Sequence, residues 1–197
     1  MIVIHPCELE RAKTILDQGK ILAVPTETVY GLAVKFDHQS AITKLLNLKD
    51  RQAKADTKKL TLMLHSLIDI PKYIALTPVA KQIIITHFPG ELTVVLPKNP
   101  SFKNPYFDNL SNIGIRIPNH PFMLDLLKNA GPLLVTSANR RGQPPCLDSD
   151  ELISHMPAID ALVLGHSGNR PPSTVLDLTG PTPKILRQGC LVVPGPK

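Results

Sequence analysis

The most constraining feature of this sequence is an alternation of short apolar segments with segments of helical periodicity. Short apolar runs bounded by turn residues favour buried strands, and apolar residues three and four positions apart favour helices. Two pairs of apolar runs follow each other too closely for a helix between them, at 21–25 with 28–34 and at 174–178 with 184–188. Such pairs must be antiparallel, because a parallel crossover needs about a dozen residues. The sequence therefore predicts a mixed sheet and excludes a purely parallel one.

The expected helices combine helical spacing with end signals, such as Pro78 behind Thr77 and the terminal Gly131. They cover residues 7–18, 38–49, 77–88, 120–131 and 148–156. The expected strands cover residues 21–25, 28–34, 60–64, 92–96, 113–117, 132–138, 161–165, 174–178 and 184–188. We expect an α/β (α+β) fold, with one twisted mixed sheet of about seven or eight strands and helices on its faces. Residues 1–197 are expected to form a single domain, with 190–197 as a short tail.

Length and composition exclude several classes of protein. The chain has 197 residues, 43% of them hydrophobic and 19% charged, which is typical of a globular protein. No apolar stretch approaches the about 18 residues of a transmembrane helix, and the first residues are too polar for a signal peptide. Cys7, Cys146 and Cys190 are far apart, so they predict neither a disulfide framework nor a metal pair. A reducing cytoplasm is the expected location.

The charge balance indicates an anionic partner. Lys and Arg number 22 against 16 Asp and Glu, which gives a formal net charge of +6. Such a balance suits a nucleotide, a nucleic acid or a phosphate, although a solvated basic surface explains it equally well. Aromatic residues make up 4% of the chain, which disfavours a platform that stacks single-stranded RNA bases.

Five polar segments interrupt or border the apolar pattern where ligand sites are expected, and one of them is 172–175 (PSTV), with Arg187 following in the last expected strand. Residues 25–32 (PTETVYGL) join two strands, and 135–142 (VTSANRRG) follow a buried strand, although both also suit tight turns. Residues 49–59 carry five basic and two acidic side chains, which indicates a phosphate site or a solvated loop. Arg116 lies within an apolar strand pattern, so it either faces solvent or is held by an anion.

Several common catalytic motifs are missing from the sequence. It contains no G-x-x-x-x-G-K-[ST] phosphate loop, no G-x-G-x-x-G fingerprint and no G-x-S-x-G elbow. A chain that handles ATP must therefore use a different cradle.

Taken together, the polar segments resemble the YrdC/Sua5 family. The resemblance covers about residues 7–189 and rests on seven segments in register: PTETVYGL, the Lys-x-Arg at 49–51, FPGELTVVLP (88–97), IGIRIPNHP (113–121), VTSANRRGQPP (135–145), STVLDLT (173–179) and ILRQG (185–189). Because the chain ends soon after ILRQG, it looks like the short, single-domain bacterial type. The resemblance implies a twisted mixed sheet of about seven strands.

The resemblance also implies an activity, L-threonylcarbamoyladenylate synthesis. In that reaction threonine, bicarbonate or CO2, and ATP give threonylcarbamoyl-AMP and pyrophosphate, a nucleotidyl transfer assisted by Mg2+ bound with ATP. The implied downstream partner is the complex that transfers the threonylcarbamoyl group to adenosine 37 of tRNA. No ligands for a metal from protein side chains are implied, and no membrane association.

The family's functional positions carry over residue by residue. The implied catalytic residues are Lys49, Arg51, Ser137 and Asn139. The implied ATP-binding residues are Lys49, Arg51, Lys58, Asn139 and Arg187. The implied threonine-binding residues are Thr28, Arg116, Ser137 and Ser173. Further positions that line the same motifs are Thr26, Glu27, Tyr30 and Arg141.

Two departures from the family pattern leave assignments open. Gln52 follows Lys-x-Arg where the family usually has proline, so Lys54 and Lys59 compete with Lys58 for the phosphate contact. Arg140 and Arg141 precede Gly142 where the family often has serine, so Arg141 either adds a phosphate contact or is only exposed. Two alternative functions remain as well. One is a non-catalytic protein that binds double-stranded RNA or tRNA weakly, and the other is a YciO-like paralogue. Retention of Lys49, Arg51, Ser137 and Asn139 favours the enzyme.

Overall fold

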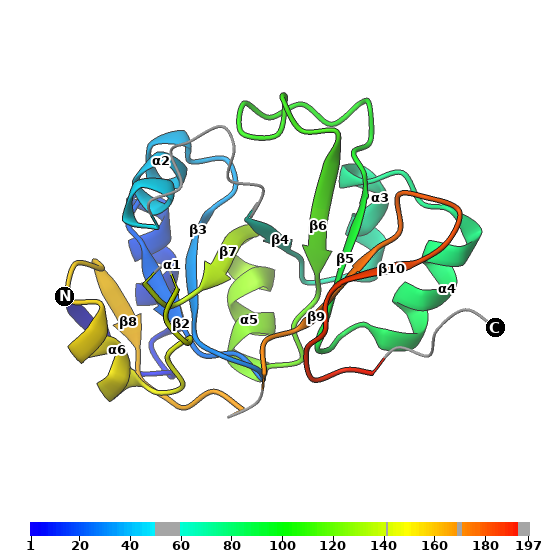
Figure 1. Ribbon diagram of the computed structural model, residues 1–197. Coiled ribbons are helices and arrows are strands. Elements are labelled where there is room, and N and C mark those ends of the chain that lie inside the picture. Colours follow the sequence, from blue (N-terminus) through cyan, green and yellow to red (C-terminus); the bar gives the residue numbers. More distant parts are fainter. Residues whose placement is uncertain (50–59, 141, 169–170, 193–197) are drawn as a thin grey trace.

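The computed structural model describes residues 1–49, 60–140, 142–168 and 171–192, and these contain one ten-stranded sheet (Figure 1). The order across the sheet is β1-β8-β2-β3-β7-β4-β6-β5-β9-β10. The strands are β1 (Ile2–Ile4), β2 (Leu22–Val24), β3 (Gly31–Lys35), β4 (Thr61–Met63), β5 (Leu92–Pro97), β6 (Asn112–Arg116), β7 (Leu133–Ser137), β8 (Ala161–Val163), β9 (Thr174–Asp177) and β10 (Lys184–Arg187). Between these strands, four neighbouring pairs are parallel and five are antiparallel. The predicted mixed sheet is confirmed.

Helices cover both faces of this sheet. They are α1 (Leu9–Asp17), α2 (Gln39–Leu48), the 3-10 helix η1 (Leu67–Asp69), α3 (Ile70–Tyr73), α4 (Pro78–His87), α5 (Pro121–Ala130) and α6 (Ser149–His155). α1 and α5 share one hydrophobic cluster with Leu22 and Val24, whereas α2, α3, α4 and α6 share another with Ala23. Successive residues of β2 thus enter different clusters, because side chains alternate across a sheet.

The two closely spaced strand pairs fold as the sequence predicts. β2 pairs antiparallel with β3, and β9 pairs antiparallel with β10. End signals also hold, since Thr77 Oγ1 accepts a hydrogen bond from the Ala80 N–H at 3.2 Å and caps α4. Gly131 closes α5 with a φ of 82°, a left-handed conformation that favours glycine.

The predicted total of about seven or eight strands is too low, although each of the nine predicted strand ranges overlaps an observed strand. β1 was not expected, because three apolar residues before a proline carry no periodic signal. This strand is defined by its distant partner, since Ile2 pairs in parallel with Ala161 of β8. The short helices η1 and α3 were also not expected. With three and four residues, they are too short to show helical periodicity.

The described helices include none that is long and apolar enough to cross a membrane.

Candidate active site

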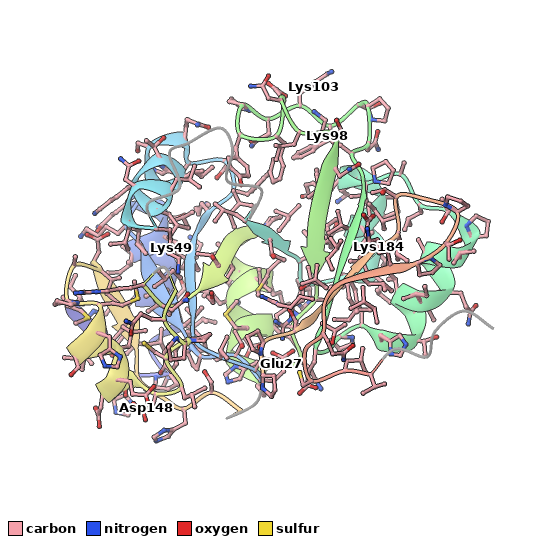
Figure 2. All side chains as sticks on the ribbon, viewed as in Figure 1. Glu27, Lys49, Lys98, Lys103, Asp148 and Lys184 are labelled. Carbon is pink, nitrogen blue, oxygen red and sulfur yellow. The ribbon has the colours of Figure 1, made fainter. Side chains whose placement is uncertain are left out.

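Lys49 lies at the carboxyl end of α2, where its backbone N–H caps the helix by donating to Leu45 O at 3.2 Å. Its side chain is buried, with 3% of the residue exposed, and it reaches the end of β7 (Figure 2). Nζ donates to Ser137 O at 3.0 Å, to Asn139 Oδ1 at 2.6 Å and to Asn139 O. Ser137 Oγ donates to Asn139 Oδ1 at 2.8 Å. Three predicted site residues therefore form one hydrogen-bonded cluster, which we call the lysine cluster.

The loop after β7 is also the turn that its sequence suggested. Asn139 Nδ2 donates to Gln143 O at 2.7 Å, which closes the turn. The side chain of Arg140 points elsewhere, because its Nε donates to His155 O at the end of α6. Asn139 thus uses its side-chain nitrogen Nδ2 for the turn and its side-chain oxygen Oδ1 for Lys49.

Arg116 ends β6 and is buried, with 4% of the residue exposed. Its Nη2 forms an ion pair with Glu27 Oε1 at 2.8 Å and donates to Thr28 Oγ1 at 3.2 Å. Its Nε donates to Gly90 O at 3.1 Å. The sequence left open whether this arginine faces solvent or is held by an anion. The structure shows that an anion holds it, namely the Glu27 carboxylate of the same chain. We call Glu27, Thr28 and Arg116 the arginine cluster.

The loop between β2 and β3 is a turn stabilised by side-chain hydrogen bonds, and it also carries residues of the candidate site. Thr26 Oγ1 accepts from the Thr28 and Val29 N–H groups and donates to Val29 O, so Thr26 stabilises the turn. Tyr30 is fully buried, and its hydroxyl oxygen lies 2.9 Å from both Val163 O and Gly165 O, the two carbonyls to which the O–H can donate. Burial raises the pKa of this phenol well above its ordinary value. Thr26 and Tyr30 therefore hold the loop in place.

Arg187, in the edge strand β10, folds back onto Ser173. Its Nε and Nη2 donate to Ser173 O at 3.1 and 2.8 Å, and Nη2 also reaches Ser173 Oγ at 3.3 Å. Ser173 Oγ shares a hydrogen bond of 2.9 Å with Thr93 Oγ1. Partial burial, followed by the charge of Arg116, lowers the pKa of Arg187. We call Thr93, Ser173 and Arg187 the serine cluster. The positive charge of Arg116 acts on the guanidinium of Arg187.

The loop before β3 joins the lysine cluster to the arginine cluster. Thr28 contacts Arg116, while two residues later Tyr30 O accepts from the Ala138 N–H at 2.8 Å, next to Ser137. The pairing of Gly31 with Ser137 continues this contact into the sheet. Lys49 and Arg116 are thus connected through one loop, and Arg187 lies beyond β5, the strand next to β6 and Arg116; cationic side chains at these positions suit anionic ligands.

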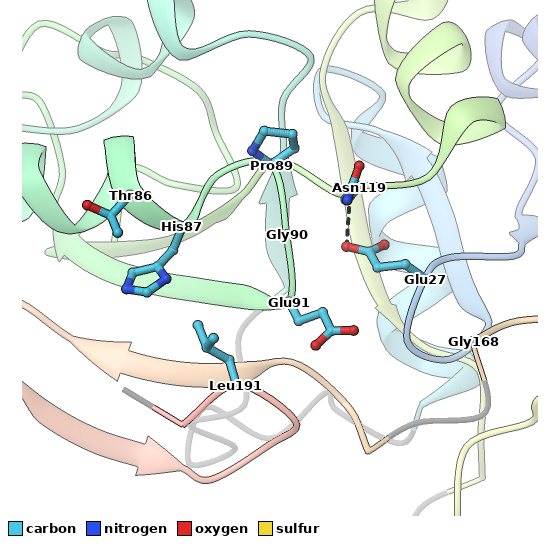
Figure 3. A pocket seen from close by; sticks show the side chains of 9 residues that line it. All are labelled: Glu27, Thr86, His87, Pro89, Gly90, Glu91, Asn119, Gly168 and Leu191. Carbon is cyan, nitrogen blue, oxygen red and sulfur yellow. Dashed lines mark hydrogen bonds between the residues drawn. The ribbon is translucent and has the colours of Figure 1, made fainter. Parts of the chain in front are cut away.

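A cavity of about 550 Å³ lies beside the arginine cluster (Figure 3). Its lining includes Glu27, Glu91, Asn119, Gly168 and Leu191. In Figure 3 the side chain of Glu91 lies between those of Leu191 and Glu27.

Some residues of this region were missed by the sequence reasoning. Thr93 lies in β5, whose sequence pattern is mainly apolar, and Glu91 lies in the loop directly before β5. Neither position was marked as part of a site by its neighbours in the sequence. Leu191 belongs to the segment predicted as a tail, yet its carbonyl accepts from Thr174 Oγ1 at 2.6 Å, so the described part of that segment returns to the site. A threonine inside an apolar strand was the one available signal.

Other predicted positions lie outside the described residues. These are Arg51, Lys58 and Arg141, together with the competing Lys54 and Lys59. Their implied roles stay predictions.

Gly189 allows the chain after β10 to pack directly on the backbone of the serine cluster. A Cβ at this position would overlap Pro172 O and lie 2.5 Å from both Ser173 C and Thr174 N. We expect Gly189→Ala to lower the free energy of unfolding by about 1–3 kcal/mol, as overpacking does. Urea denaturation measures this change.

Gly180→Ala is the matched control, because a Cβ at Gly180 meets no atom within 4 Å. We expect its unfolding free energy to stay within about 0.5 kcal/mol of the parent value. Equal midpoints for the two variants would show that the 189 turn does not pack as described.

Comparison with known proteins points to one family. A family model named for Sua5, YciO and YrdC, and described as "Telomere recombination", matches residues 14–189. The chain is 34% identical over 190 residues to the threonylcarbamoyl-AMP synthase of Enterobacter sp. (strain 638), covering 92% of this chain and 95% of that protein.

Solved structures of similar proteins share the fold over nearly the whole chain. Sua5 of P. abyssi, in complex with L-threonine, is 28% identical with a TM-score of 0.85 over 96% of this chain. This chain spans 58% of that Sua5 chain. E. coli YciO is 26% identical with the same TM-score of 0.85, covering 96% of this chain and 95% of its own.

Proposed function

Because the chain belongs to the Sua5/YciO/YrdC family, we propose that it is a threonylcarbamoyl-AMP synthase, a nucleotidyltransferase that uses L-threonine, bicarbonate or CO2, and ATP. The observation that carries this proposal is the connection of the lysine and arginine clusters through the loop before β3, with the serine cluster on or next to the neighbouring strands β5, β9 and β10. Relatives named threonylcarbamoyl-AMP synthase and a Sua5 structure with L-threonine support the choice of substrates.

The proposed chemistry has two steps that balance without a covalent enzyme intermediate. The amine of threonine adds to the carbon of CO2 and loses a proton, which leaves a carbamate. A carbamate oxygen then attacks the α-phosphorus of ATP, the bond to the bridging oxygen breaks, and pyrophosphate leaves. Such transfers depend on positioning and on charge stabilisation, not on a strong protein nucleophile.

The clusters divide these tasks in the proposal. Lys49 faces the developing charge of the phosphates, with Ser137 and Asn139 holding its ammonium group in place. Arg116 receives the threonine carboxylate, and Thr28 lies beside it. Arg187 supplies a second positive charge from the serine cluster. Two fixed guanidinium groups near each other repel, so their arrangement is favourable once an anion lies between them.

Mg2+ is proposed to enter with ATP, bound to its phosphates. The described residues contain no group of three or more His, Cys, Asp and Glu side chains that could hold a metal ion, and the three clusters are mainly cationic. The described side chains therefore do not form a dedicated metal site, and we assign no step to one. The product is proposed to pass to the complex that transfers threonylcarbamoyl to tRNA.

Release of pyrophosphate tests the proposed function. We expect the purified chain, given ATP, Mg2+ and bicarbonate, to release pyrophosphate when L-threonine is added, and to release none when threonine or bicarbonate is left out. Mass spectrometry of the mixture identifies threonylcarbamoyl-AMP. Pyrophosphate release that ignores threonine, or no release at all, would contradict the proposal. Salt-sensitive RNA binding without turnover would instead favour the RNA-binding alternative.

A further inference from the structure

Arg116 is oriented by three acceptors that occupy two of its three nitrogen atoms. Nε is held by Gly90 O, and Nη2 is held by Thr28 Oγ1 and by Glu27 Oε1. Among the described residues none accepts a hydrogen bond from Nη1, so this edge of the guanidinium can donate to a ligand. Because the guanidinium is planar, fixing Nε and Nη2 also fixes the direction of Nη1.

Glu27 differs from the other two acceptors in charge and in distance. Its Oε1 lies 2.8 Å from Nη2, against 3.1 and 3.2 Å for the neutral acceptors. The pair is buried, with side-chain exposures of 5% for Arg116 and 14% for Glu27, so solvent screens it weakly. Oε2 is buried and has no hydrogen-bond partner among the described residues. The carboxylate therefore depends on Arg116 for neutralisation, and Arg116 on the carboxylate for its orientation.

Two backbone contacts hold Glu27 in turn. The Asn119 N–H donates to Glu27 Oε1 at 2.8 Å, which ties the carboxylate to the loop after β6 (Figure 3). On the other side, the backbone of Gly168 lies against that of Glu27. A Cβ at Gly168 would overlap Glu27 O and lie 2.8 Å from Glu27 C, so only glycine permits this approach. The segment after β8 is thereby connected to Arg116 through Glu27.

We propose that Glu27 is a positioning residue: it holds the Arg116 guanidinium in the orientation that receives the carboxylate of threonine, and Gly168 holds Glu27. This inference rests on the proposed function. It assigns Glu27 a role through Arg116 and no direct contact with the reacting atoms. All three contacts have the charged guanidinium as donor, but only Glu27 adds an opposite charge, so its loss loosens Arg116 more than loss of the Gly90 or Thr28 contact.

Glu27→Gln and Gly168→Ala test the inference by different routes. The first removes the charge and keeps the shape, and the second displaces the loop without touching a side chain of the cluster. For both we expect the Kd of threonine in calorimetry, and its KM in pyrophosphate release, to rise at least tenfold. The KM of ATP should stay within twofold. In an Arg116→Met background, Glu27→Gln should change threonine binding no further.

Matched controls separate positioning from general damage. Asp17→Asn breaks an ion pair of the same 2.8 Å length, with Lys35, away from the three clusters. Gly180→Ala adds a methyl group where a Cβ has open space. Both should leave the Kd of threonine unchanged.

Three outcomes would overturn the inference: an unchanged Kd of threonine in Glu27→Gln, an equal rise in the KM of ATP, or parent protein that does not bind threonine. Because calorimetry measures threonine binding without pyrophosphate release, failure of this inference can be told apart from failure of the proposed function. Parent protein that binds threonine but releases no pyrophosphate would contradict the proposed function alone, because the binding comparison between variants still holds.

Discussion

Replacement of Arg116 by methionine is expected to abolish saturation by threonine and to destabilise the fold as well. The substitution leaves the Glu27 carboxylate buried without its cation, and breaking a buried ion pair in this way costs about 3–5 kcal/mol. Loss of the contact between Arg116 and the threonine carboxylate should raise the KM of threonine by about 100-fold or more, since removing one partner of a buried charge pair costs about 3 kcal/mol. Thermal unfolding and pyrophosphate release measure the two effects.

A double variant separates stability from binding. In Arg116→Met with Glu27→Gln the buried charge is gone, so most of the lost unfolding free energy should return. Threonine binding should not return, because no cation faces its carboxylate. Arg116→Lys should lie between the parent and Arg116→Met, since a lysine keeps the charge but cannot reproduce the planar fork. Recovery of threonine binding in the double variant would contradict the assigned role of Arg116.

Replacement of Lys49 by methionine is expected to lower kcat for pyrophosphate release by about 100-fold or more, as loss of one preorganised group that stabilises a developing charge typically does. Methionine approximates the length of the lysine stem but removes the Nζ donor from Asn139 O, whereas Ser137 O still accepts from the Asn139 N–H and Asn139 Oδ1 still accepts from Ser137 Oγ. Each unpaired buried acceptor costs about 1–3 kcal/mol, so the midpoint of thermal unfolding should also fall. Single-turnover kinetics and circular dichroism measure the two changes.

Lys44→Met is the matched control for Lys49, because it removes a lysine from the same helix. Lys44 forms an exposed ion pair with Asp160 at 2.7 Å, far less buried than the contacts of Lys49. Exposed pairs contribute about 0–1 kcal/mol, so activity should be unchanged and stability nearly so. If Lys44→Met and Lys49→Met lose activity equally, the lysine cluster is not the phosphate site.

Much of the fold was predictable because its signals are local. Two strands joined by a few residues must pair antiparallel, which the β2–β3 and β9–β10 pairs confirm. A Thr-Pro pair predicts the start of a helix at Pro78. By contrast, β1 depends on a partner about 160 positions away, and no property of residues 2–4 names that partner.

The site was predictable as a set of segments and not as a set of contacts. The polar residues at 26–30, 116, 137–139, 173 and 187 stood out because they interrupt apolar strands. Their individual roles did not follow, since Thr26 and Tyr30 hold the loop whereas Thr28 faces Arg116. Thr93 was missed because a buried threonine in a strand is ordinary until Ser173 is found opposite it.

The sequence by itself determined the order of most strands and helices, the mixed character of the sheet and the segments that carry the site. Each of these follows from residues within a few positions of one another, where periodicity and turn chemistry act. Only the tertiary structure decided that the anion beside Arg116 is Glu27, 89 positions earlier, and that the backbone of Gly168 packs against the backbone of Glu27. Partners so far apart meet through the packing of the whole sheet, and burial then makes their charges depend on each other.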